Sequence, residues 1–168
     1  MLQELSDLRH SIMDGRTHDA LLLVEELDGM SRKAIIRAIR SYLVRMLVHL
    51  IKYQAERRLT NSWAASIRGS VREIQHLNLQ DNKRSFYVGS DEWQEHLEDL
   101  WDDALDEASL EAFSGRYDAK ELSELIDSKR VLVIAIELLN AIYTIPRKEI
   151  AAYIDERLKQ NDALKNCH

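Results

Sequence analysis

The chain has 168 residues, of which 45% are hydrophobic and 31% charged, and its formal net charge is −6. Pro146 is the only proline and Cys167 the only cysteine, which excludes a disulfide or a cysteine metal site within one chain. No apolar run approaches the ~18 residues of a membrane span. We therefore expect a soluble, cytoplasmic, all-α protein, with a single domain over residues 1–160 and a frayed tail over 161–168.

The first two predicted helices are short. Leu2–Met13 is amphipathic, with Leu5, Leu8 and Ile12 on one side, and Gly15 is placed to end it. Thr17 can cap a second helix, in which we expect Leu21–Val24 to be buried and Glu25 and Glu26 to face out, and which we expect to end at Gly29.

A long helix from Ser31 to Gln54 follows and forms the predicted centre of the fold. Its apolar residues recur every three or four positions and make a stripe wide enough to pack against several neighbours. Ser31 stands at the expected N-cap. The prediction is a helical bundle of about six or seven helices around this long central helix.

Asn61 or Ser62 can cap the next helix at Trp63, and small residues on it, including Gly69, predict close packing of a neighbouring helix. A loop over Leu79–Ser90 leads to an acidic helix that opens at Asp91.

Three signals organise the rest of the chain. Asp118 and Glu121 form a predicted helix cap. Val131–Tyr143 is apolar nearly all round; its run Val131–Ile136 fits a strand on periodicity alone, but the chain offers it no partner strand, so a helix is favoured. Glu137 within it needs a polar partner if it is buried. Pro146 suits the first turn of a last helix.

Charge is segregated along the chain. Ten basic residues and one acid, Glu56, lie between Arg32 and Arg72, whereas Asp91 to Glu111 holds ten acids and no lysine or arginine. Either the acidic helix lies against the basic one, or the basic surface serves a partner.

Catalytic and metal signatures are weak. Glu73 and His76 have the spacing of di-iron helical bundles, but no second copy of the pair is present. Glu92, His96, Asp99 and Asp103 share one helix stripe, which is typical of a solvated face. We predict no catalytic residue, no cofactor and no metal site.

One basic cluster is a candidate binding surface. Two adjacent arginines beside an aromatic ring can hold phosphate and stack a base. The alternative is that the arginines pair with the acidic helix while the ring is part of the core. The cluster consists of His49, Lys52, Gln54, Arg57, Arg58 and Trp63.

The same cluster resembles a known signature. The segments His49–Gln54, Glu56–Arg58 and Ser62–Trp63, with Arg72 beyond them, resemble a mainly cyanobacterial family catalogued as domain of unknown function twenty-nine. The spacer between Gln54 and Glu56 is shorter than is usual in that family, and the region after Gly115 departs from it. The resemblance implies an all-helical fold and no assigned activity.

The favoured function is a non-enzymatic interaction or regulatory module that binds a protein partner or itself, through the last two helices or the Arg57/Arg58 corner. Self-association should then fall when Leu138 or Leu139 is made charged. The alternative is a nucleic-acid-binding protein that uses Lys52, Arg57, Arg58 and Trp63. We predict no membrane partner.

Overall fold

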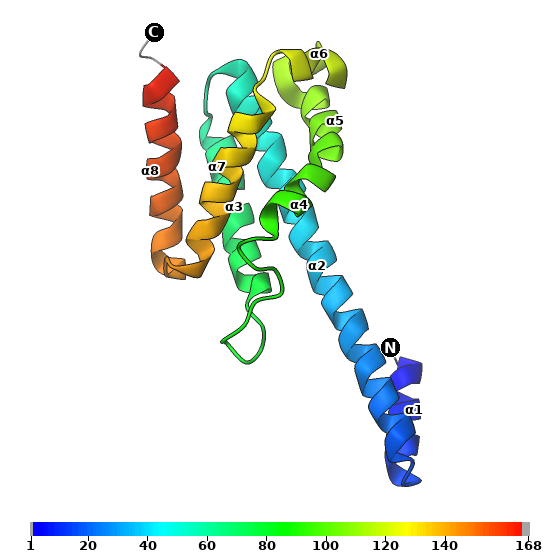
Figure 1. Ribbon diagram of the computed structural model, residues 1–168. Helices are drawn as coiled ribbons and strands as arrows, with labels where there is room; N and C mark the ends of the chain where they lie inside the picture. The colour runs from blue at the N-terminus through cyan, green and yellow to red at the C-terminus, as the bar shows by residue number, and fades with distance from the viewer. Residues whose placement is uncertain (1, 166–168) are drawn as a thin grey trace. The chain divides into compact units, whose positions relative to one another are not determined.

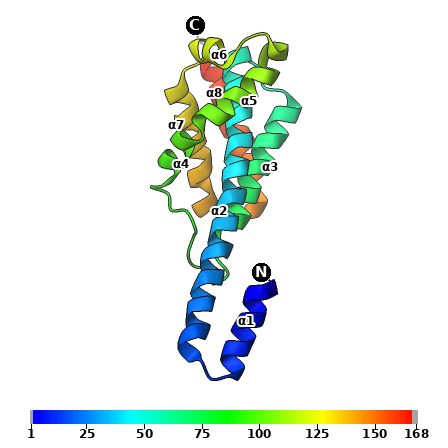
Figure 2. The same ribbon diagram turned by 90° about the vertical axis from the view of Figure 1, so that its right-hand side faces the viewer.

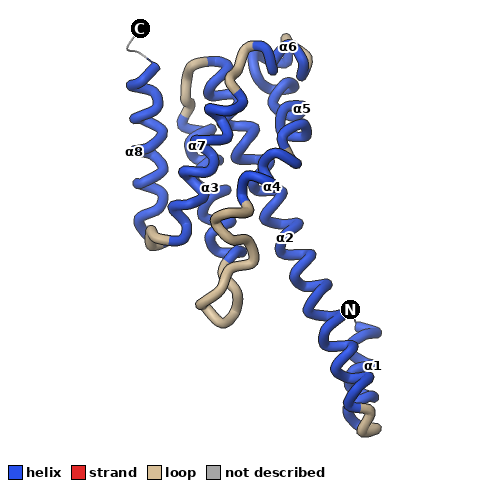
Figure 3. Tube along the Cα trace, viewed as in Figure 1, coloured by secondary structure: helices blue, strands red, loops and turns tan. Residues whose placement is uncertain are grey.

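The structure, a computed structural model, describes residues 2–165 and consists of helices joined by loops (Figures 1 and 3). Eight α-helices and two short 3₁₀ helices occur in this range, and no strand is present in it. The predicted all-α fold is confirmed. Contacts divide the chain into two compact units, Met1–Arg37 and Ala38–His168, which we describe separately.

The first unit is a helical hairpin of α1 (Leu2–Met13) and the first part of α2 (Thr17–Glu56). Gly15 makes the turn with a φ of 72°, a conformation that glycine adopts without steric cost. The Arg16 N–H donates to the Ser11 carbonyl at 2.8 Å and closes the end of α1. The predicted bounds of α1 and the start at Thr17 are both confirmed. We call this unit, α1 with residues 17–37, the hairpin.

The expected break at Gly29 and the N-cap at Ser31 are wrong, because α2 runs without interruption from Thr17 to Glu56. A single glycine inside a helix costs only about 1 kcal/mol. The strong helix formers on both sides outweigh that cost, and no proline enforces an end. The helix ends two residues after the predicted Gln54, where Arg57 adopts a left-handed φ of 56°.

In the second unit, the last part of α2 lies among the other helices (Figure 2). Its inward side chains are at most 2% exposed, so the prediction of a central helix with neighbours on several sides is confirmed. These core residues are Leu43, Met46, Leu47, Leu50, Ile51 and Tyr53.

The surrounding helices follow in chain order. They are α3 (Asn61–Asn78), α4 (Trp93–Asp99), α5 (Trp101–Glu111), η1 (Ala112–Gly115), α6 (Ala119–Glu124), α7 (Ser128–Asn140), η2 (Ala141–Tyr143) and α8 (Arg147–Lys165). Contacts between α3 and α8, α4 and α7, and α5 and α6 hold them together. Residues 166–168, part of the predicted tail, lie outside the described residues.

Local signals fixed several of these helices. Asp118 and Glu121 make the predicted capping box, with the Glu121 N–H donating to the Asp118 carboxylate at 2.8 Å. Thr60 caps α3, one residue before the predicted Asn61. The apolar run after Val131 is helical rather than extended, as expected.

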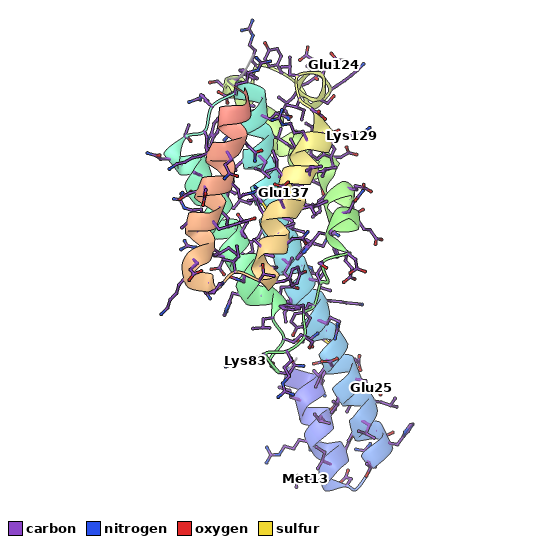
Figure 4. All side chains as sticks on the ribbon, turned by 60° about the vertical axis from the view of Figure 1, so that its left-hand side comes forward. Met13, Glu25, Lys83, Glu124, Lys129 and Glu137 are labelled. Atoms are coloured by element: carbon purple, nitrogen blue, oxygen red, sulfur yellow. The ribbon has the colours of Figure 1, made fainter. Side chains whose placement is uncertain are left out.

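The acidic segment and Glu137 differ in detail from expectation. The acids occupy two helices, α4 and α5, that meet at Leu100, and Asp91 does not cap them because the N-cap is Glu92. The Glu137 carboxylate, which is only half-buried, accepts from Arg157 on α8 at 2.6 Å (Figure 4).

The loop after α3 is held by two side chains. The Asn78 side chain accepts from the Val88 N–H at 2.7 Å and donates to the Val88 carbonyl at 2.9 Å. The Tyr143 hydroxyl donates to the same carbonyl at 2.7 Å. No described helix combines the length and the apolar character needed to cross a membrane.

Candidate functional site

Lys52 lies at the centre of the predicted cluster, and it is buried, with 6% of the residue exposed. Its Nζ donates to the Oε2 of Glu111 on α5 at 2.6 Å and lies 4.5 Å from the centre of the Trp63 ring. A buried ammonium needs such partners, because an unpaired charge in the interior is strongly destabilising. The fold therefore uses Lys52 to join α2, α3 and α5.

Trp63 itself is only 9% exposed. The Arg58 guanidinium lies 5.0 Å from its ring centre, so two cations flank one indole. Arg58 also donates to the Glu56 carboxylate at 2.9 and 3.1 Å, and the other oxygen of Glu56 accepts from the Phe113 N–H at 3.3 Å. The ring packs with the core and leaves little open face for a base to stack on.

The remaining three residues of the cluster point in different directions. The Gln54 side chain accepts from the Asp127 N–H at 2.7 Å, which ties α2 to the start of α7. Burial lowers the pKa of His49, and the nearby Lys52 cation lowers it further. The buried Nδ1 of His49 has no hydrogen-bond partner in the described structure. Arg57 is exposed at the end of α2.

Of the six predicted residues, the structure brings together Lys52, Arg58 and Trp63. Only Arg57 and Arg58 of the set are exposed. Nucleic-acid binding by this cluster stays a prediction. Arg57 and Arg58 are the residues of the cluster that are most open to solvent.

The acidic helices lie against the basic helix, as one of the two interpretations of the charge pattern requires. Arg40 on α2 forms an ion pair with Asp99 on α4, and Lys52 pairs with Glu111 on α5. Part of the basic charge is therefore neutralised within the second unit.

Metal-binding geometry is absent from the described residues, where no three His, Cys, Asp or Glu side chains are grouped to hold an ion. The Nδ1 of His76, from the Glu73/His76 pair, lies 3.2 Å from Nη1 of Arg147. Because arginine only donates, a hydrogen bond here uses this nitrogen of His76 as the acceptor.

Sequence reasoning missed the apolar surface of the hairpin. Among its described residues only Ser11 and Ala20 are buried, although α1 and α2 both carry large apolar side chains. Ile12 is 63% and Met13 74% exposed, and Figure 4 shows Met13 at the turn. The predicted burial of Leu21–Val24 is wrong, because four consecutive residues point all round a helix and most of them are exposed here.

Comparison with known proteins gives one match. Residues 13–118 match the family described as Domain of unknown function DUF29. The chain belongs to this family. The DUF29 match confirms the resemblance seen at His49–Trp63, and it covers all of α2 together with α3, α4 and α5 but neither α7 nor α8. No curated protein and no solved structure matches the chain.

Proposed function

We propose that this DUF29 protein is a non-enzymatic interaction module that binds a second copy of itself through the hairpin. The observation that carries the proposal is the exposure of large apolar side chains on a unit with almost no core. The exposed residues are Leu5, Ile12, Met13, Leu21, Leu22, Val24 and Met30. Apolar surface gathered in this way is typical of a protein-binding site.

The interface originally predicted on the last two helices is not the favoured one. Leu138 and Leu139 on α7 are at most 1% exposed and belong to the core. A charge at either position would unfold the second unit rather than report on association. The hairpin takes their place in the proposal.

One face of α2 carries the features expected of a symmetric contact. Leu22, Gly29 and Ile36 are seven residues apart and so share that face. Leu22 is exposed, and a side chain at Gly29 would meet no other group within 4 Å. A helix-interior glycine that no neighbour requires lowers stability, but it lets a second helix approach closely.

Charge favours a second copy of the chain as the partner. Four acids and no lysine or arginine lie between Thr17 and Met30, whereas Arg32, Lys33 and Arg37 follow without an acid. If two copies cross antiparallel at Gly29, Glu25 of one faces Lys33 of the other, since each lies four residues from the crossing point, and symmetry repeats the pair. The helix is self-complementary in this orientation only.

Charge reversal tests the proposal. Glu25→Lys and Lys33→Glu should each weaken the dimer by about tenfold or more, because each places like charges opposite one another twice. Combining both changes in one chain should restore the dimer, and so should mixing the two single variants. Light scattering after gel filtration reads out the mass.

The rescue is the control, since a change that merely disturbed the helix would not be repaired by a second one. Helical circular dichroism of each variant checks that the fold is intact. A dimer unaffected by either reversal, or a double variant as weak as the single ones, would overturn the antiparallel arrangement.

A further inference from the structure

A second feature of the structure is independent of the hairpin. A depression of about 720 Å³ opens in the second unit where α2, α3 and α8 meet. Four of its lining residues are cations, although the protein as a whole is acidic. We call it the basic depression, and its lining includes Tyr42, Arg45, Gly69, Arg72, Arg147 and Lys148.

The four cations of the basic depression have no carboxylate partner among the described residues. Three other basic side chains of this unit have a carboxylate partner: Lys52 pairs with Glu111, Arg68 with Asp155 and Arg157 with Glu137. Glu73 is the one acid among the described lining residues, and no ion pair joins it to these cations. Net positive charge therefore converges on one hollow and is left for an external anion.

Arg147 is held in place without losing its charge. Its Nη1 lies 3.2 Å from Nδ1 of His76, an imidazole rather than a carboxylate. The contact orients the guanidinium fork at the edge of the hollow while the remaining N–H groups stay available. Arginine forks that are fixed in this way suit bidentate contacts to phosphoryl oxygens.

Gly69 leaves space in the basic depression for a bound anion. It lies in the interior of α3, where glycine is less favourable than alanine, and a Cβ built on it would meet no atom within 4 Å. The predicted role of Gly69 in close helix packing is therefore wrong. The missing side chain leaves space on the wall of the depression instead.

We propose that the basic depression binds a small anion containing a pyrophosphate group, either free or as part of a nucleoside diphosphate. Two linked phosphoryl groups match four cations spread over three helices better than one does. The volume lies in the range of ~300–1,000 Å³ that small-molecule sites occupy. This site belongs to the second unit and does not depend on the proposed self-association.

Isothermal titration of the full chain with inorganic pyrophosphate, and separately with adenosine diphosphate, tests the site. Saturable binding of either at one site per chain is expected. Arg147→Gln/Lys148→Gln should weaken it at least about tenfold, through the loss of two charge-assisted contacts. If adenosine diphosphate binds more tightly than pyrophosphate, the ligand is a nucleoside diphosphate. If it binds equally or more weakly, the ligand is the free pyrophosphate anion.

The matched control is Lys129→Gln/Arg130→Gln, another adjacent basic pair in the first turn of a helix, α7 (Lys129 in Figure 4). It should change the affinity less than about twofold, because distant exposed charges are screened. Gly69→Leu should abolish binding while thermal unfolding shows an intact fold. The proposal is overturned if neither probe binds. It is also overturned if the Arg147/Lys148 and Lys129/Arg130 double variants lose the same amount of affinity. Binding of oligonucleotides alone, tightening with their length, would replace it with a nucleic-acid surface.

Discussion

The Nζ of Lys52 lies 2.6 Å from the Oε2 of Glu111, in an ion pair between residues 59 positions apart in the chain. The two ends differ, since the lysine side chain is 7% exposed and the glutamate 54%. This pair, with the Trp63 ring beside it, fastens α5 to α2 and α3. A residue expected to serve a ligand is thus part of the scaffold.

Replacing Glu111 should lower the free energy of unfolding more than replacing Lys52. Glu111→Gln leaves the buried Lys52 ammonium with the Trp63 ring as its remaining partner. We expect the free energy of unfolding to fall by about 1–2 kcal/mol, a value already discounted because solvent screens the exposed Glu111 carboxylate. Lys52→Met keeps the packing volume, and the expected change is below about 1 kcal/mol. Urea denaturation of both single variants and the double variant measures the coupling. Equal losses for Glu111→Gln in the presence and absence of Lys52 would contradict the account.

Stability should depend on pH through His49. Burial, followed by the Lys52 cation, lowers the pKa of His49 below the ordinary 6.5, so the unfolded chain binds the proton more readily than the folded one. The contribution of His49 to the free energy of unfolding should be constant above about pH 6.5. It should decrease as the pH drops below about 6.5. His49→Gln should flatten that part of the profile. A slope that is the same in the wild type and in His49→Gln would contradict this assignment.

Gly69→Ala should stabilise the protein. The new methyl group meets no atom within 4 Å, and alanine is favoured over glycine in a helix interior by about 0.5–1 kcal/mol. Gly115→Ala is the contrasting change, because Gly115 has a φ of 75° and its Cβ would lie 3.0 Å from the Leu110 carbonyl oxygen. It should destabilise by more than about 1 kcal/mol. Thermal unfolding ranks the two, and the reverse order would show that Gly69 packs against a neighbour.

Much of the fold could be predicted because its signals are local. The bounds of α1 and the capping box at Asp118 depend on residues a few positions apart. Gly29 was misjudged because a glycine weakens a helix without ending it. A signal of this kind indicates where a helix is weak and leaves open whether it stops.

The candidate site was harder to predict, because its contacts are long-range. Sequence gave no means of knowing that Gln54 meets Asp127, or that Arg147 and Arg72 lie beside one hollow. Periodicity identified the apolar stripe of α1 through Leu5 and Ile12, but it carries no information on whether another element covers that stripe. Both proposed surfaces therefore rest on the solvent exposure and the three-dimensional placement of side chains, which the pattern of residues along the chain does not predict.

The most direct test of self-association is sedimentation equilibrium of the full chain over a wide concentration range. We expect a dimer that Leu22→Glu converts to a monomer, because a carboxylate would be buried at the crossing of the two α2 helices. Leu110→Glu, at an apolar residue of the second unit that is 77% exposed, should leave the dimer intact. A wild-type chain that is monomeric at every concentration, or a dimer that Leu22→Glu does not affect, would contradict the account.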